Sequence, residues 1–219
     1  MHKTIENLTN IEKELKSSLS NFSNLRLPKI IAVSKTFKMD MILPLVEYGH
    51  LDFGENKVQE AVDKWTEIKL KNSNIKLHMI GKLQTNKVKF AVKIFDYIHS
   101  VDSQKLAKKI SEEQKKINKN IKIFIQVNIG NEVQKSGINK KELNTLVSYC
   151  KKINLDVVGL MCIPPLNADS SIYFKEMSLL SKVVLLPELS MGMSSDYINA
   201  SENSSTYIRI GSSIFGERF

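Results

Sequence analysis

A lysine at the end of an apolar run is the first residue whose position could support chemistry. Lys35 follows the run 30–33 and Ser34, so we expect its amine at the end of a buried strand. An ammonium held among apolar neighbours loses hydration, which lowers its pKa and frees the amine to form a Schiff base with a carbonyl. The simpler alternative is a lysine that projects from the strand end into solvent.

An arginine and a glycine-serine turn stand near the other end of the chain. Gly211 and Ser212 follow a short apolar run and begin a helical turn, whose unpaired backbone N–H groups favour an anion such as phosphate. Ser194 could add a hydroxyl, whereas simple helix capping is the alternative role for the serines. The Arg209 guanidinium keeps its proton and needs an acceptor, either a pyridine nitrogen or a carboxylate. An amine, an anion site and a ring-nitrogen partner together describe a pocket for pyridoxal 5′-phosphate (PLP).

Other familiar sites are missing from the sequence. It contains no G-x-S-x-G, H-E-x-x-H or C-x-x-C motif. The four histidines lack the spacing of metal ligands, so we expect no metal site. The segment 211–216 has the two glycines of a P-loop but not the Lys-Ser/Thr that follows them, which argues against a nucleoside triphosphate site.

Composition and charge are those of a globular protein. The 219 residues are 42% hydrophobic and 25% charged, and 32 basic against 23 acidic residues give a net charge of +9. Nearly all the excess is lysine spread along the chain, so we expect a solvated surface and no nucleic-acid partner. No apolar run approaches the roughly 20 residues that cross a membrane, and the polar start does not resemble a secretory signal. With only two cysteines, the sequence favours a cytoplasmic protein.

Eight short, apolar, β-branched runs alternate with stretches of helical spacing. The expected strands are 29–33, 51–53, 77–80, 97–101, 121–127, 157–161, 188–191 and 207–210. A helix over 8–22 is expected to precede them. The strand 121–127 is apolar almost throughout, which is typical of parallel strands covered on both faces.

Two parallel α/β folds fit this alternation, a closed (β/α)₈ TIM-type barrel and an open doubly wound sheet. Polar or glycine residues follow every expected strand, as they do where barrel active sites are built, whereas an open sheet would concentrate them at one switch point. We therefore predict the barrel. Because no linker divides the chain, we expect one domain over residues 1–219.

Seven segments, in order, resemble motifs of the pyridoxal phosphate homeostasis proteins. They are residues 32–36, 53–60, 78–87, 135–137, 159–161, 189–194 and 209–216. The resemblance covers nearly the whole chain. It implies a barrel similar to the N-terminal domain of alanine racemase, with PLP held as a lysine aldimine.

The same resemblance assigns roles to particular residues. Lys35 is the aldimine lysine, and Arg209 faces the pyridine nitrogen. The residues that hold the phosphate or line the pocket are Gly211, Ser212, Ser194 and Asn56. Ser212 stands where many members have threonine, which keeps the hydroxyl. The lysines that could rim the site as rivals are Lys57, Lys82, Lys87 and Lys135.

The function implied is PLP homeostasis, meaning buffering of PLP or its delivery to PLP-dependent apoenzymes, without catalytic turnover. An arginine at the ring nitrogen weakens PLP as an electron sink. Moreover, the sequence shows no second, β-rich domain of the kind that brings a catalytic tyrosine to racemases. The alternatives are a PLP-dependent, racemase-like enzyme on a small amino acid and a basic nucleic-acid-binding protein with a vestigial site. A closed barrel has no edge strand, so a monomer is expected.

Overall fold

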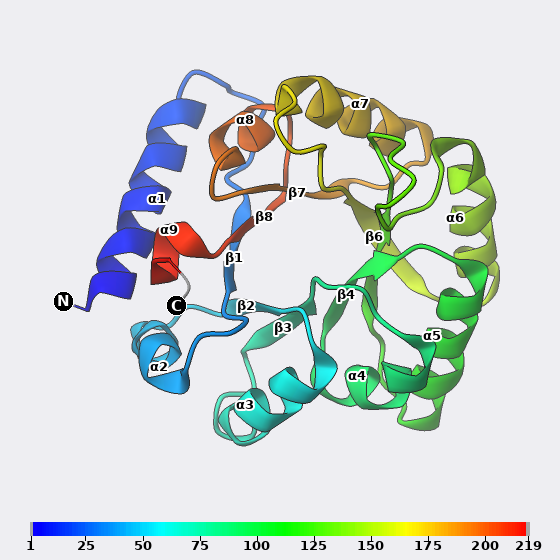
Figure 1. Cartoon of the computed structure of the whole chain (residues 1–219), viewed down its shortest axis with the longest axis horizontal. Coiled ribbons are helices and arrows are strands. Elements are labelled where there is room, and N and C mark those ends of the chain that lie inside the picture. The colour runs from blue at the N-terminus through cyan, green and yellow to red at the C-terminus, as the bar shows by residue number, and fades with distance from the viewer. Residues whose placement is uncertain (1, 218–219) are drawn as a thin grey trace.

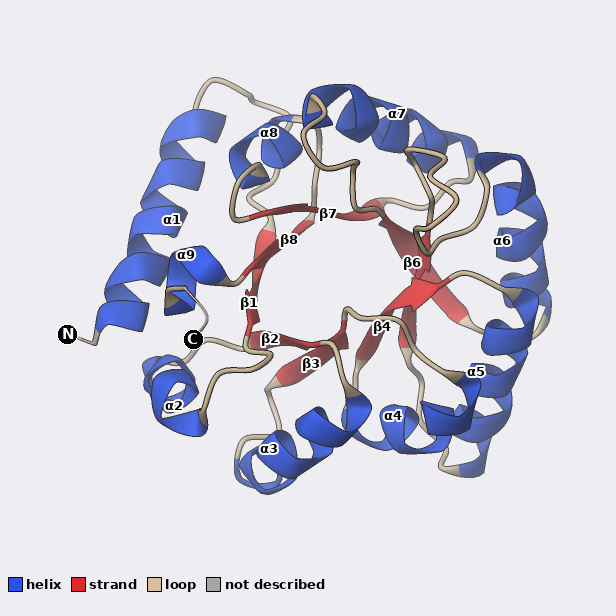
Figure 2. Ribbon diagram, in the orientation of Figure 1, coloured by secondary structure: helices blue, strands red, loops and turns tan. Residues whose placement is uncertain are grey.

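The chain folds as a closed barrel of eight parallel strands in the order β1 to β8, with the helices outside it (Figures 1 and 2). The computed structural model describes residues 2–217. The strands are β1 Lys29–Val33, β2 Asp52–Glu55, β3 Lys76–Met79, β4 Tyr97–Val101, β5 Lys122–Gln126, β6 Asp156–Met161, β7 Glu188–Met193 and β8 Tyr207–Ile210. Sequential strands pair, and β8 closes the ring on β1. The predicted (β/α)₈ barrel is therefore confirmed.

The helices alternate with these strands. They are α1 Lys3–Leu19, α2 Met39–Tyr48, α3 Val58–Lys71, α4 Val88–Ile94, α5 Gln104–Lys116, α6 Leu143–Lys152, α7 Ser170–Val183, α8 Tyr197–Glu202 and α9 Ser212–Phe215. Single 3₁₀ turns, Thr85–Lys87 and Lys140–Glu142, lead into α4 and α6. None of the helices in the described range 2–217 combines the length and apolar character that crossing a membrane requires.

Several expected boundaries differ from the observed ones by a few residues, those of the second strand and of the opening helix among them. The second strand runs on through Gly54 and Glu55, because these residues pair with His78 and Met79 of β3 and are buried. Asn56, not Gly54, is therefore the first residue after β2. The opening helix ends at Leu19, short of Phe22, whose side chain is largely exposed.

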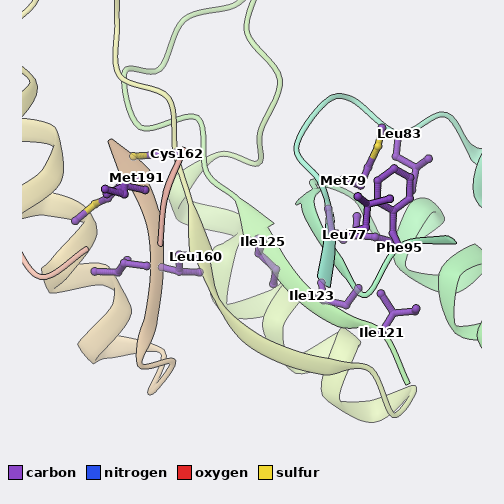
Figure 3. Close-up of a cluster of buried hydrophobic side chains, with 14 of the residues drawn as sticks. Leu77, Met79, Leu83, Phe95, Ile121, Ile123, Ile125, Leu160, Cys162 and Met191 are labelled. Atoms are coloured by element: carbon purple, nitrogen blue, oxygen red, sulfur yellow. The ribbon is translucent and has the colours of Figure 1, made fainter. Parts of the chain in front are cut away.

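Apolar side chains pack on both faces of the strands. The larger core lies between the barrel and its helices, and Figure 3 labels some of its members on β3, β5, β6 and β7: Leu77, Met79, Ile123, Ile125, Leu160 and Met191. A smaller cluster consists of Ile31, Tyr97, Phe124, Met161 and Tyr207. On β5, Phe124 belongs to the smaller cluster while its neighbours Ile123 and Ile125 belong to the larger one. This alternation explains why the strand reads as continuously apolar.

Candidate active site at the carboxyl ends of the strands

The residues singled out in the sequence gather at one end of the barrel, where the strands finish. Each follows a strand or stands near the end of one, in the region where barrel enzymes bind ligands. Lys35 is the second residue after β1, Asn56 the first after β2, Ser194 the first after β7 and Gly211 the first after β8, while Ser212 begins α9 and Arg209 is the third residue of β8.

A cavity of about 390 Å³ at this end brings Lys35 and Asn56 together. It is lined by Lys35, Asn56, Ile80, Gly81, Lys82, Gln126, Asn128, Gln134, Lys135, Ser136 and Ile163. Arg209, Ser194, Gly211 and Ser212 are not part of this lining. They lie on β8 and the turns after β7 and β8, and β8 is the direct neighbour of β1. The cavity that contains Lys35 and the turns after β7 and β8 therefore lie close together at this end of the barrel.

Lys35 is fixed in place by its neighbours in the chain. Ser34 is fully buried, and its hydroxyl donates to Glu55 Oε1 at 2.7 Å, an oxygen that also accepts from Trp65 Nε1 at 3.1 Å. Burial raises the pKa of the Glu55 carboxyl. Thr36 then takes a φ of 69°, in the left-handed region. Lys35 therefore stands on a tight turn with a constrained residue on each side, and its own side chain is half-buried.

Asn56 presents an acceptor that the described residues leave unsatisfied. Its Oδ1 atom is buried and has no hydrogen-bond partner among them. Gly81 packs directly against it, since a Cβ on Gly81 would lie 2.4 Å from the Asn56 carbonyl oxygen. A glycine is needed there, and the close approach fixes the Asn56 backbone at the cavity wall. A buried acceptor without a partner is costly in a protein alone, and a ligand donor would satisfy it.

The turn after β8 gathers backbone donors around one hydroxyl. The Ser194 Oγ accepts from the N–H of Gly211 at 3.3 Å and from that of Ser213 at 3.4 Å. Both are long for N–H···O bonds, so these donors are only weakly satisfied. A Cβ on Gly211 would meet nothing nearer than Val33 at 3.5 Å. Phosphate oxygens could take up the same donors at better distances.

Arg209 is buried and points across the barrel. Its Nη1 donates to Ser190 Oγ at 2.8 Å and its Nη2 to the Cys162 carbonyl at 2.9 Å. Within residues 2–217 no carboxylate lies at ion-pair distance from it. Burial lowers the pKa of the guanidinium, which stays charged nonetheless. Of the acceptors suggested by the sequence, a protein carboxylate is thus not the one in contact.

Two histidines in this interior were missed by the sequence reasoning, which treated all four as scattered. His78 and His99 are fully buried, and their rings meet with a distance of 2.9 Å between Nδ1 of His78 and Nε2 of His99. The usable signal was their position on neighbouring strands, since Leu77 and Met79 on either side of His78 and Ile98 before His99 belong to the larger core. The described residues 2–217 contain no cluster of three His, Cys, Asp or Glu side chains suited to a metal ion.

The rival lysines divide into two groups. Lys82 and Lys135 line the same cavity as Lys35, while Lys57 and Lys87 line a neighbouring one with Asn56. Lys82 is exposed. Lys135 donates to the Pro164 carbonyl at 3.0 Å and pairs with Glu132 at 2.6 Å.

Known proteins show where this barrel belongs. The family described as alanine racemase, N-terminal domain, matches residues 7–218. A pyridoxal phosphate homeostasis protein from Vibrio cholerae is 36% identical over 97% of this chain and 95% of its own. The chain belongs to the pyridoxal phosphate homeostasis protein family. A relative of the same name from Aquifex aeolicus is 38% identical over 87% of each chain.

A solved structure of a family member adds a bound ligand to the comparison. The Synechococcus elongatus protein PipY, determined with PLP bound, is 31% identical. It aligns with a TM-score of 0.84 over 97% of this chain and all of its own. Three features of the site described above are compatible with such a ligand. These are the unsatisfied buried acceptor of Asn56, the weakly satisfied donors at Gly211 and Ser213, and a buried Arg209 without a carboxylate.

Proposed function

We propose that this protein binds PLP and serves PLP homeostasis, holding the cofactor and releasing it to PLP-dependent apoenzymes. The observation that carries the proposal is the cavity that Lys35 shares with Asn56, beside the donors of the β7 and β8 turns. Its relatives are named for PLP homeostasis, and PipY is known with PLP bound. PLP brings an aldehyde that condenses with a lysine amine, releasing water.

Each site residue has one task in this proposal. Lys35 supplies the amine for the covalent link, on a turn held from both sides. Arg209 donates to the ring nitrogen, and Asn56 accepts from a donor of the ligand. The phosphate takes the backbone and hydroxyl donors of Gly211, Ser212 and Ser194. Lys35 is preferred over Lys82 because Lys35 is half-buried on a constrained turn whereas Lys82 is exposed, and the family resemblance gives the covalent role to Lys35 and not to Lys135.

The proposal includes the absence of turnover. The titratable side chains among the described residues that line the cavity are all lysines, namely Lys35, Lys82 and Lys135. A guanidinium at the ring nitrogen leaves that nitrogen unprotonated, which weakens the electron withdrawal that carbanion chemistry needs. The membership in the alanine racemase N-terminal domain family keeps the racemase-like alternative worth testing. Exchange of an amino acid's α-proton with deuterated water, dependent on Lys35, would establish that alternative.

The proposal extends to the setting in which the protein works. We propose one domain that acts as a monomer in the cytoplasm, with no nucleic-acid partner. Cys150 and Cys162 are both free and buried, which suits a reducing compartment.

The decisive experiment is borohydride reduction of the purified protein after addition of PLP, followed by peptide mass mapping. We expect a pyridoxyl group on Lys35, a yellow protein that bleaches on reduction, and no label in Lys35→Ala. Lys82→Ala is the matched control from the same cavity and should label as the wild type does. A label confined to another lysine would reject the role of Lys35, and a protein that shows no visible absorption once excess PLP has been removed would reject the function.

A further inference from the structure

A line of four hydrogen bonds crosses the inside of the barrel and ends at Arg209. Asp52 Oδ1 lies 2.9 Å from His78 Nε2, and His78 Nδ1 lies 2.9 Å from His99 Nε2. His99 Nδ1 lies 2.8 Å from Ser190 Oγ, which lies 2.8 Å from Arg209 Nη1. We call these five residues the interior chain. They come from β2, β3, β4, β7 and β8.

The protons of the interior chain can be ordered in only one direction. The Asp52 carboxylate can only accept, so a neutral His78 carries its proton on Nε2 and leaves Nδ1 as an acceptor. A neutral His99 then carries its proton on Nε2 and donates to His78 Nδ1. His99 Nδ1 is then an acceptor, so the Ser190 hydroxyl donates to it, while the Ser190 oxygen accepts from the Arg209 guanidinium, which can only donate. Every bond therefore points from Arg209 toward Asp52.

The surroundings favour this neutral, ordered state. The His78 ring stacks on Tyr97 and the His99 ring on Phe124, with centroids 4.3 and 4.2 Å apart. Burial lowers the pKa of both histidines, and the neighbouring charge of Arg209 lowers that of His99 further. Burial also raises the pKa of the Asp52 carboxyl, but the hydrogen bond from His78 and nearby charges lower it by more.

The two ends of the interior chain stand at different positions along their strands. Asp52 is the first residue of β2, with an 18% exposed side chain, and lines a groove beside Lys29 and His50. Arg209, at the other end, sits two residues before the Gly211 turn. The negatively charged Asp52 therefore lies at the start of β2, and the positively charged Arg209 lies next to the proposed cofactor site.

We propose that Asp52, His78, His99 and Ser190 are positioning residues that together hold Arg209 in the orientation that meets the ring nitrogen of PLP. This inference rests on the proposed function. Ser190 acts directly on the guanidinium, and the other three fix the direction in which Ser190 donates. A change at Asp52 therefore alters a pocket that Asp52 does not touch.

The protein without cofactor provides the first test. Nitrogen-15 NMR of labelled histidines reports which ring nitrogen carries the proton, with signals assigned by His78→Gln and His99→Gln variants. We expect the Nε2–H form for both residues at pH 7. A proton on Nδ1 of either histidine would overturn the proposed order. The Arg209 side-chain N–H signals, distinct in the wild type, should average in Ser190→Ala.

The loaded protein provides the second test, through its visible spectrum and PLP affinity. Ser190→Ala and Asp52→Leu should shift the absorption maximum and weaken PLP binding at least about fivefold, because each removes a hydrogen bond of the interior chain. Asp52→Asn keeps an acceptor oxygen and should change less, and Ser190→Thr should restore the wild-type spectrum. The matched control is Ser205→Ala, a buried serine that donates to the Met191 carbonyl outside the interior chain.

The outcomes separate the two claims. A wild-type spectrum and affinity in both Ser190→Ala and Asp52→Leu would overturn the positioning role while leaving the proposed function intact. Failure of the wild type to bind PLP would instead reject the proposed function. In that case the histidine tautomers and the Arg209 signals still decide whether the interior chain orders Arg209.

Discussion

The ammonium of Lys64, on α3, donates to the backbone carbonyl of Ser34, the residue before Lys35, at a distance of 3.0 Å. The same Lys64 contacts Glu60 Oε1 at 2.6 Å, and that carboxylate oxygen accepts from the Thr36 N–H, also at 2.6 Å. The ion pair between Lys64 and Glu60 on α3 therefore hydrogen-bonds to the backbone on both sides of Lys35. The left-handed φ of Thr36 is held by this contact.

Removing the Glu60 carboxylate should make the backbone around Lys35 less constrained without changing a residue that lines the cavity. In Glu60→Ala, the Thr36 N–H loses a charge-assisted bond, and we expect PLP affinity to fall roughly tenfold. Titration followed by visible absorbance measures the change. Glu67→Ala, an exposed glutamate on the same helix, is the control and should bind as the wild type does. Equal PLP affinities in the two variants would mean that the contact between Glu60 and Thr36 does not affect PLP binding at Lys35.

The buried histidines predict how stability depends on pH. A base whose pKa is lower in the folded protein binds fewer protons there than in the unfolded chain, so stability falls as the pH drops below the ordinary value of 6.5. Each of His78 and His99 contributes a slope of at most about 1.4 kcal/mol per pH unit. Urea unfolding at pH 7.5, 6.5 and 5.5 measures this slope.

The pKa values of other groups also shift in the folded protein, so the comparison with a variant is the decisive quantity. Glu55, whose pKa is raised by burial, contributes with the opposite sign. The difference in slope between the wild type and His99→Phe removes this term and isolates His99. We expect the variant to lose less stability on acidification than the wild type. Parallel pH profiles would show that the pKa of His99 does not change on folding, against the lowered pKa inferred here.

The sequence was most informative about local features and least about contacts across the barrel. The fold could be predicted because parallel strands are apolar on both faces, as β5 shows, and because polar residues follow each strand. Lys35 and Asn56 line one cavity because they follow neighbouring strands, β1 and β2. The interior chain was not predictable, because His99 and Ser190 are 91 residues apart and meet only through barrel closure. The roles of the site residues stay predictions.

Substitution by alanine at two glycines near strand ends, Gly81 and Gly211, should have different effects on stability. A Cβ at Gly81 would lie 2.4 Å from the Asn56 carbonyl oxygen, so the backbone must move. A Cβ at Gly211 would meet nothing nearer than 3.5 Å, and the φ of −114° suits any residue. We expect Gly81→Ala to cost about 1–3 kcal/mol, as overpacking does, and Gly211→Ala to leave stability within about 0.5 kcal/mol. Thermal unfolding checks both, and equal losses would contradict the close approach at Asn56.

Removal of the Ser194 hydroxyl tests which part of the ligand contacts the turn after β8. If Ser194, Gly211 and Ser212 hold the phosphate, Ser194→Ala should weaken PLP binding while leaving the binding of pyridoxal, which lacks the phosphate, unchanged. We expect a loss of roughly tenfold for PLP, the size of one hydrogen bond to a charged group. Lys35→Ala is the complementary variant, because it should weaken both ligands. An equal loss of affinity for PLP and pyridoxal in Ser194→Ala would mean that the Ser194 hydroxyl contacts the ring or its aldehyde, and that the phosphate binds elsewhere.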